Sequence, residues 1–309
     1  MSEQFAFTGR KVGVFLGGVS AEREVSLRTG AAAAAALRRL GCDVREIDIR
    51  EDWLGTIRDA GVDVAFLALH GRFGEDGCIQ AACELARLPY TGSGVAASAI
   101  AMSKVLGKRV AASAGVPCAP DAVYEGADRA GAKPPDFGFP LVVKPDREGS
   151  TVGITIVRGP DQWEAALAEA AKYDTRILAE GFIPGREITV GILNGKVLPA
   201  IEIVPKSGFY DYRSKYTAGQ TEYVIPVPMD RDILLRAAEY TRRAARTMGL
   251  RGAARLDYRI DPAGNVFFLE ANTIPGMTET SLLPKAAKFD GLTFDELVAG
   301  ILSDAGLGK

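Results

Sequence analysis

Four polar residues near the carboxyl end of the sequence have a spacing that suits metal chemistry. Arg255 and Asp257 are two residues apart, and so are Glu270 and Asn272. In a β-strand, side chains two apart lie on the same face, so each pair would point the same way. Carboxylate and amide oxygens are ligands that Mg2+ accepts while it also holds substrate phosphates. The pattern fits a magnesium site, and it also fits a polar hairpin face with a salt bridge from Arg255.

The turn between these two strands decides whether the acids meet. If the turn has an even number of residues centred on Ala263-Gly264, Asp257 faces Glu270 and Arg255 faces Asn272. A three-residue turn would break that phase, so the sequence leaves the register open. Two acids on facing strands repel each other unless a cation lies between them.

A second candidate is a lysine that precedes a glycine-bounded loop. The segment runs from Lys144 to Gly153 and carries Ser150 and Thr151. Backbone N–H groups of such a loop can surround phosphates while the lysine neutralises their charge. The lysine comes before the glycines, so this is not a Walker A loop. An ordinary hairpin turn is the simpler alternative.

Two more loops follow apolar runs near the amino end. The loop Gly17–Glu24 lacks G-x-G-x-x-G, which argues against a dinucleotide site. Its Glu22 suits either a substrate ammonium or the first turn of a helix. The loop His70–Gly77 carries three glycines and several charges, which is typical of a functional loop. A lone histidine is also often structural.

Two later loops complete the candidates. The segment Lys206–Tyr216 mixes aromatic and basic residues, which suits base stacking or a lid that excludes water. A net charge of −2 favours the lid. The segment Asn272–Pro284 follows the proposed metal strand; Gly276 permits close backbone approach, and Ser281 suits a carboxylate. A plain connecting loop is the alternative.

The elements that must position these residues predict an α/β unit followed by α+β units. Strands at Lys11–Leu16, Asp43–Ile49 and Val62–Leu69 alternate with helical stretches, which predicts a parallel sheet. Ligands bind beyond the carboxyl ends of such strands, where the loops with Glu22 and His70 begin. Further elements are a helix at about 95–114, a hairpin of 140–144 with 153–157, a strand at 176–180, a hairpin of 187–193 with 197–204, a helix at 230–248, and a hairpin of 253–260 with 266–272.

Composition narrows the class of protein. A chain of 309 residues exceeds one typical core and indicates several domains. The pI of about 5.7 argues against general nucleic-acid binding. The 4 cysteines and 1 histidine show no zinc-ligand spacing. No apolar run approaches the ~18 residues of a membrane span. We expect a cytoplasmic chain with reduced thiols and no nucleic-acid or membrane partner.

Together these segments resemble the D-alanine–D-alanine ligase family, part of the ATP-grasp group. The resemblance covers roughly residues 11–301 and rests on motifs in the family's order and spacing: GGVSAEREVSL, ALHGRFGEDG, YTGSG, KPDREGSTVG, FYDYRSKY, RLDYRI and LEANTIPGMTETSLLP. It implies an ATP-grasp fold, with a parallel α/β domain at 1–102 and two α+β domains at 103–184 and 185–309 that clasp ATP. A lid is expected at about 205–220.

The resemblance also implies roles for single residues. ATP-binding positions are Lys104 and Lys144 at the phosphates, Glu180, Phe182 and Ile183 beside adenine, and Glu187 at the ribose. Magnesium ligands are Asp257, Glu270 and Asn272. Catalytic positions are Glu22, Ser150, Tyr216, Arg255 and Gly276, and substrate-binding positions are His70, Lys215, Ser281 and Leu282. Four residues depart from the family pattern and bear on nucleotide fit: Ala253 and Ala254 replace a Trp-Gly pair, Ser103 stands where many relatives carry Asp, and Gly181 stands at a position that is often basic.

The implied reaction is ATP-dependent ligation of two D-alanines through an acyl phosphate, for peptidoglycan precursor synthesis. The implied cofactors are ATP and two Mg2+ ions, with Mn2+ as a substitute, and the implied assembly is a homodimer. Three rivals remain: a ligase of other amino acids on the same fold, a nucleotide-dependent oxidoreductase, and a non-catalytic ATP-binding regulator. The missing dinucleotide motif speaks against the second, and the complete polar set on the last hairpin speaks against the third.

Overall fold

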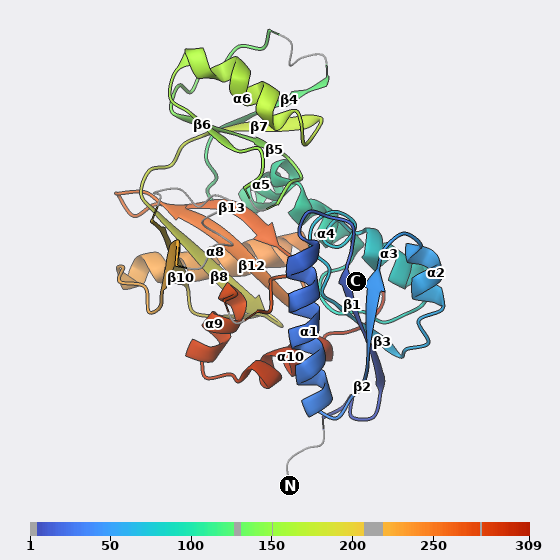
Figure 1. The fold of residues 1–309 in the computed structure, drawn as a ribbon. Helices are drawn as coiled ribbons and strands as arrows, with labels where there is room; N and C mark the ends of the chain where they lie inside the picture. The colour runs from blue at the N-terminus through green and yellow to red at the C-terminus, as the bar shows by residue number, and fades with distance from the viewer. Residues whose placement is uncertain (1–4, 127–130, 150, 207–218, 279) are drawn as a thin grey trace.

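Three β-sheets organise the chain, and each forms a separate layer in Figure 1. The structure is a computed structural model, and it describes residues 5–126, 131–149, 151–206, 219–278 and 280–309. None of the helices in these ranges is long and apolar enough to cross a membrane.

The strands of the amino-terminal layer are parallel, as the sequence predicts, and their order is β2-β1-β3. Its strands are β1 (Lys11–Gly17), β2 (Asp43–Ile49) and β3 (Val64–Leu67), and its helices are α1 (Arg23–Arg39), α2 (Trp53–Arg58) and α3 (Cys78–Leu85). The alanines Ala33, Ala34 and Ala36 of α1 are fully buried. Their small side chains let the helix lie close to its neighbours, and α1 runs beside the sheet and α10 in Figure 1.

The second layer is an antiparallel sheet in the order β4-β7-β5-β6, at the top of Figure 1. Its strands are β4 (Asp121–Glu125), β5 (Leu141–Pro145), β6 (Thr155–Val157) and β7 (Arg176–Gly181). Helix α6 (Trp163–Ala170) packs on β5 and β6, with the large Trp163 side chain 2% exposed.

The third layer is a six-stranded antiparallel sheet in the order β11-β10-β8-β12-β13, with β9 paired to β8. Its strands are β8 (Arg186–Leu193), β9 (Lys196–Val197), β10 (Ile201–Pro205), β11 (Thr221–Val224), β12 (Ala253–Ile260) and β13 (Val266–Asn272). Helix α8 (Arg231–Met248) lies behind this sheet, and α9 (Leu282–Phe289) and α10 (Phe294–Ser303) lie between it and α1 (Figure 1).

Two predicted elements are interrupted. The helix expected at 95–114 is two helices, α4 (Val95–Met102) and α5 (Lys104–Ser113), because Ser103 is extended and caps α5 through Leu106 N at 3.1 Å. The strand expected at 197–204 is divided between β9 and β10. The short strands β4 and β11 were not predicted, because neither has a clear alternation of apolar and polar residues.

The hairpin of β12 and β13 has the pairing expected for an even turn, although its turn is odd. Asp257 faces Glu270 and Arg255 faces Asn272. The strands end at Ile260 and Val266, so the turn has an odd number of residues and the assumption of an even turn was wrong. A β-bulge restores the phase: Tyr258 pairs with Phe268 and Asp257 with Glu270, which leaves Leu269 outside the pairing.

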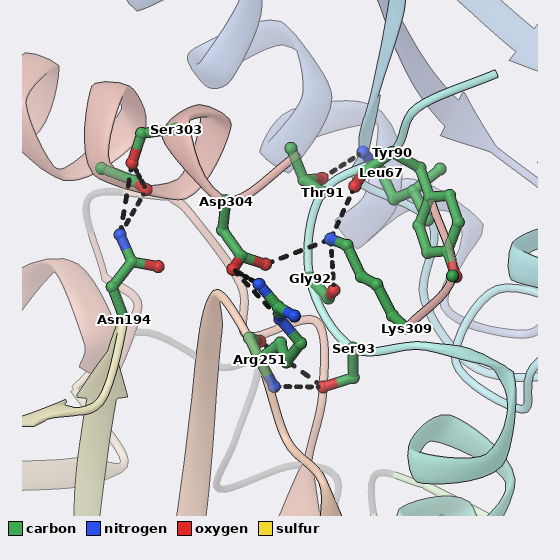
Figure 2. Close-up of polar contacts among 12 residues, drawn as sticks. Leu67, Tyr90, Thr91, Gly92, Ser93, Asn194, Arg251, Ser303, Asp304 and Lys309 are labelled. Carbon is green, nitrogen blue, oxygen red and sulfur yellow. Dashed lines mark hydrogen bonds and ion pairs between the residues drawn. The ribbon is translucent and has the colours of Figure 1, made fainter. Parts of the chain in front are cut away.

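A polar cluster joins the first and third layers (Figure 2). The Lys309 ammonium donates to Gly92 O at 2.9 Å and Tyr90 O at 2.8 Å, and it lies 3.1 Å from Asp304 Oδ2. Arg251 pairs with the same Asp304 at 3.0 Å. The loop between α3 and α4 is thereby held beside the start of β12.

Candidate functional site

Hydroxyl groups hold the Glu22 loop at the carboxyl edge of the parallel sheet. Gly17 N–H donates to Ser26 Oγ at 2.8 Å, and this hydroxyl donates to Ala68 O at 2.7 Å. Ser20 Oγ donates in turn to His70 O at 2.7 Å. The loops with Glu22 and His70 therefore lie side by side, at the one edge of the sheet where both were predicted.

Gly71 lies at the meeting point of two carboxylates. Its φ is +69°, and a Cβ there would lie 3.0 Å from Glu22 Oε2, so a side chain would be both strained and crowded. Its N–H donates to Glu75 Oε2 at 2.6 Å. The glycine lets the backbone approach both acids closely.

Burial changes the charge of this corner. The pKa of Glu75 is raised to about 8 by burial and by the nearby Glu22 charge. Burial also lowers the pKa of His70, and Arg255 lowers it further, although Glu22 acts in the opposite direction. At neutral pH His70 is therefore neutral and Glu75 is protonated.

A cavity of about 180 Å³, here called cavity I, opens beside this corner. The predicted residues that line it are Glu22, His70, Lys104, Arg255, Glu270, Asn272, Gly276, Ser281 and Leu282. It is also lined by charged and aromatic residues that no motif singled out as individual candidates, namely Arg28, Glu75, Glu148 and Tyr223. Both signs of charge line this cavity, which suits a zwitterionic ligand.

The far wall of cavity I is the start of α9. Ser281 precedes the helix, and its Oγ accepts from Thr278 N at 3.0 Å and lies 2.8 Å from Thr278 Oγ1. Leu282 is the first residue of the helix. The amino end of a helix presents N–H groups and a partial positive charge, which favour a carboxylate there.

A second cavity of about 120 Å³, cavity II, lies between the four-stranded and six-stranded sheets. The predicted residues that line it are Lys104, Lys144, Glu180, Phe182, Ile183, Glu187, Asp257 and Glu270. Apolar walls come from Val142, Ile154 and Leu269. Apolar walls together with a few charged groups suit a nucleobase and its phosphates.

A buried ion network supports cavity II. Lys144 Nζ lies 2.5 Å from Glu180 Oε1, and Lys108 Nζ lies 2.8 Å from Glu180 Oε2. Lys108 is fully buried, donates to Ala119 O at 3.0 Å and lies 3.1 Å from Asp121. Burial would raise the pKa of Glu180, but the two ammonium groups outweigh it and the pKa is lowered. No motif pointed to Lys108, although it is four residues after Lys104 on one helix face.

The two cavities meet at one ion pair. Lys104 and Glu270 line both of them, and Lys104 Nζ lies 3.2 Å from Glu270 Oε2. Lys104 Nζ also donates to Glu148 O at 2.6 Å. A group transferred from a ligand in one cavity to a ligand in the other would pass this pair.

One of the residues predicted to hold a metal, Asn272, offers an oxygen that could bind a divalent ion. Asn272 Oδ1 is buried and has no hydrogen-bond partner among the described residues. Asp257 lies opposite Glu270, receives Arg255 at 3.0 Å on each oxygen, and accepts from Thr189 Oγ1 at 2.5 Å. Within the described ranges, no three His, Cys, Asp or Glu side chains lie close enough together to hold a metal ion. The predicted ligands are instead the two carboxylates of Asp257 and Glu270 and the amide oxygen of Asn272.

Three predicted residues cannot be placed. Ser150, Lys215 and Tyr216 lie outside the described residues. All the other predicted site residues line cavity I or cavity II.

Comparison with known proteins gives the family. Residues 112–303 match the profile of the D-Ala D-Ala ligase C-terminus, and residues 50–93 match that of the D-Ala D-Ala ligase N-terminus. The chain belongs to the D-alanine–D-alanine ligase family. It is 51% identical to the D-alanine–D-alanine ligase of Syntrophotalea carbinolica over 97% of each chain. It is 47% identical to that of Citrifermentans bemidjiense, over 96% of this chain and 97% of the relative.

Solved structures of the family have the same fold. The D-alanine–D-alanine ligase of Bacillus anthracis complexed with ATP superposes with a TM-score of 0.83 and 31% identity, over 96% of this chain and 97% of that one. VanG D-Ala:D-Ser ligase of Enterococcus faecalis superposes with a TM-score of 0.84 and 28% identity, over 96% of this chain and 99% of that one. The predicted ATP-grasp fold, with a parallel amino-terminal sheet and antiparallel sheets after it, is confirmed.

Proposed function

We propose that the chain joins two D-alanines to D-alanyl-D-alanine, with ATP converted to ADP and phosphate, as a step in peptidoglycan precursor synthesis. The observation that carries the proposal is the meeting of cavities I and II at the Lys104–Glu270 pair. ATP in cavity II would direct its terminal phosphate toward this pair. The amino acids in cavity I would have their carboxylates within reach of that phosphate.

In the first step, the carboxylate of one D-alanine attacks the γ-phosphate and forms an acyl phosphate, and ADP leaves. Glu22 receives the ammonium of this D-alanine, because neutral His70 and protonated Glu75 beside it carry no competing charge. Lys144 and Lys104 offset the negative charge of the transferred phosphoryl group.

In the second step, the amine of the other D-alanine attacks the acyl carbon, and phosphate leaves with the electron pair of the broken C–O bond and takes up the proton that the nitrogen releases. The second carboxylate would lie at Ser281 and the start of α9, at the far wall of cavity I. Arg255 and Gly276 N–H, both on the wall of cavity I, would stabilise the tetrahedral oxyanion.

The family uses ATP with a divalent metal ion, and Asp257, Glu270 and Asn272 are the residues proposed to hold it here. The bound ion would neutralise phosphate oxygens. We further propose two Mg2+ ions with Mn2+ as a substitute, a homodimer, a cytoplasmic location and the domain limits 1–102, 103–184 and 185–309. Roles for Ser150 in the phosphate loop, and for Lys215 and Tyr216 in a lid at about 205–220, belong to the same proposal.

The direct test mixes the purified protein with ATP, Mg2+ and D-alanine and follows phosphate release together with the dipeptide by mass spectrometry. We expect both products in equal amounts, and neither with L-alanine. Phosphate release without dipeptide would contradict the ligation. A folded protein that binds ATP without any turnover would favour the regulator.

The acceptor is tested separately, because one structural relative is named a D-Ala:D-Ser ligase. D-serine and D-lactate are offered against D-alanine as second substrates, and the mixed products are counted. We expect the D-alanyl-D-alanine product to dominate. A dominant mixed product would keep the two-step chemistry and change the assigned substrate.

A further inference from the structure

The cavity-facing side of β12 carries a third charged residue, Arg259. It follows Arg255 and Asp257 at the strand spacing of two, so the three side chains share a face. On the neighbouring strand β8, Arg259 lies directly opposite Glu187, and Asp257 lies opposite Thr189. Arg259 also lines cavity II. It lies within the motif RLDYRI, but no role was predicted for it.

The contacts of Arg259 converge on one short segment. Its Nε donates to Ile183 O at 3.2 Å, and its Nη2 donates to Gly185 O at 2.9 Å. Its Nη1 lies 3.4 Å from Glu187 Oε2. The centre of the guanidinium lies 5.9 Å from the centroid of the Phe182 ring. All of these partners lie within residues 182–187.

Residues 182–185 connect β7 of the four-stranded sheet to β8 of the six-stranded sheet. The first half of the connection is fixed to the four-stranded sheet, because Phe182 N–H donates to Pro140 O at 3.0 Å and Gly181 N–H donates to Pro120 O at 2.9 Å. Arg259 fixes the second half to the six-stranded sheet. The connection that lines cavity II is thereby anchored from both sides.

We propose that Arg259 is a nucleotide-positioning residue, which orients the Glu187 carboxylate toward the ribose hydroxyls and holds the 182–185 backbone against the base. The inference rests on the proposed binding of ATP in cavity II. A guanidinium has a planar fork of donors, so it can serve a carboxylate and two carbonyls at once, which an ammonium cannot do. A carboxylate that is already oriented loses less entropy when a ligand hydroxyl donates to it. The side chains of Arg259 and Glu187 are 20% and 17% exposed, so water screens this pair only in part.

Gly181, which carries no charge, lines the same cavity as Arg259. The resemblance implies that this position is often basic in the family. In this chain a Cβ at Gly181 would lie 3.2 Å from Pro120 Cγ. Gly181, the last residue of β7, supplies no cation to cavity II. Arg259 supplies a positive charge to the same cavity from β12 of the six-stranded sheet.

The test compares Arg259→Met and Arg259→Lys with the parent protein. The matched control is Arg236→Met, because Arg236 donates to Gly264 O at 3.3 Å in the turn of the same hairpin and lines neither cavity. Dissociation constants for ADP are measured by calorimetry, and KM and kcat by phosphate release. For Arg259→Met we expect the dissociation constant for ADP and the KM for ATP each to rise about tenfold. We expect kcat at saturating ATP and KM for D-alanine to stay within about twofold, since neither depends on the connection.

Two comparisons separate positioning from general damage. Arg259→Lys retains a charge for Glu187 and should recover part of the affinity, whereas Arg236→Met should match the parent. The parent should bind 2′-deoxy-ADP and 3′-deoxy-ADP more weakly than ADP. In Arg259→Met this difference should shrink, because Glu187 is no longer oriented. If Arg259→Met does not fold, the affinities of Arg259→Lys for ADP and the two deoxynucleotides are compared with those of the parent instead.

Unchanged ADP affinity in folded Arg259→Met, or equal deoxynucleotide penalties in parent and variant, would overturn the inference while ATP binding itself stands. A fall in kcat with unchanged ADP affinity would also overturn it. A parent protein that binds no adenine nucleotide would overturn the proposed function and this inference together.

Discussion

Arg255 is the residue whose replacement should separate chemistry from binding. It lines cavity I and contacts both oxygens of Asp257 at 3.0 Å. If it stabilises the oxyanion, Arg255→Ala should lower kcat by about 100-fold or more, with a much smaller change in KM for ATP. Steady-state kinetics with phosphate release give both constants. Near-normal turnover would remove Arg255 from the mechanism.

Lys108 illustrates the cost of removing one partner from a buried ion network. Its ammonium is fully buried between Glu180 and Asp121. Lys108→Met would leave two carboxylates without this charge, and we expect a loss of about 3–5 kcal/mol in the free energy of unfolding. Denaturant unfolding measures it. The control is Lys172→Met, an exposed lysine paired with Glu169, which should unfold like the parent. Equal stability of the two variants would contradict the network's importance.

Glu75 should give the native protein a specific pH dependence. Its pKa is raised from 4.5 to about 8, so between these values the native state holds a proton that the unfolded state has released. Stability from this group is therefore highest at low pH and falls as pH rises through that window. Glu75→Gln keeps an oxygen for Gly71 N–H and removes the titration. Its melting temperature relative to the parent should rise between pH 5 and pH 8. A constant difference across that range would contradict the raised pKa.

The junction of α4 and α5 shows how a small departure from the family pattern is accommodated. Asp146 is fully buried and accepts from Ser103 Oγ at 3.0 and 2.8 Å and from Val105 N at 2.9 Å. Ser103→Asp would bring a second carboxylate to this position, so we expect a loss of about 1–3 kcal/mol in the free energy of unfolding. Because α5 begins at Lys104, KM for ATP should rise as well.

The exchange variant Ser103→Asp with Asp146→Ser provides the control for this prediction. It restores one carboxylate and one hydroxyl at the junction, so it should be more stable than Ser103→Asp alone. Chemical denaturation of the two variants decides the point. If the exchange is no better than the single change, then repulsion between the acids is not the cause.

The sequence predicts elements well where patterns are local. The parallel sheet and the helix α8 follow from periodicity, and the pairing of Asp257 with Glu270 was foreseen as one of two registers. The bulge at Leu269 was not foreseen, because it depends on how β13 packs between β12 and α5. The break at Ser103 depends in the same way on Asp146, which is distant in the sequence.

The site residues whose partners are distant in the sequence were not identified from the sequence alone. Lys108 and Arg259 had weak local signals, a spacing of four from Lys104 and a spacing of two from Asp257. Their partners, Glu180 and the 182–187 segment, are 70 or more residues away in the sequence. A local pattern cannot show such partners, and only the folded chain brings them together.

At the scale of the whole molecule, cavity I exists only because the first and third layers dock. Met277 N–H donates to Thr29 Oγ1 at 3.3 Å, and the same hydroxyl lies 3.2 Å from His70 Nε2. The Lys309 cluster holds the two layers together at another point (Figure 2). The residues proposed to bind substrate at the amino-terminal sheet therefore lie beside the hairpin of β12 and β13, which carries the proposed catalytic residue Arg255.

The docked arrangement predicts that metal and nucleotide bind together. In the free protein Arg255 compensates Asp257 and Lys104 compensates Glu270, so Mg2+ alone would compete with two cations for its ligands. A nucleotide triphosphate offers those cations other partners and brings phosphate ligands for the metal. We expect a small rise in melting temperature with Mg2+ alone, a moderate rise with a non-hydrolysable ATP analogue alone, and a rise with both that exceeds their sum. Asp257→Asn should retain the response to the analogue and lose the excess. A full response to Mg2+ alone, or an excess that survives in Asp257→Asn, would contradict a metal site shared with the nucleotide.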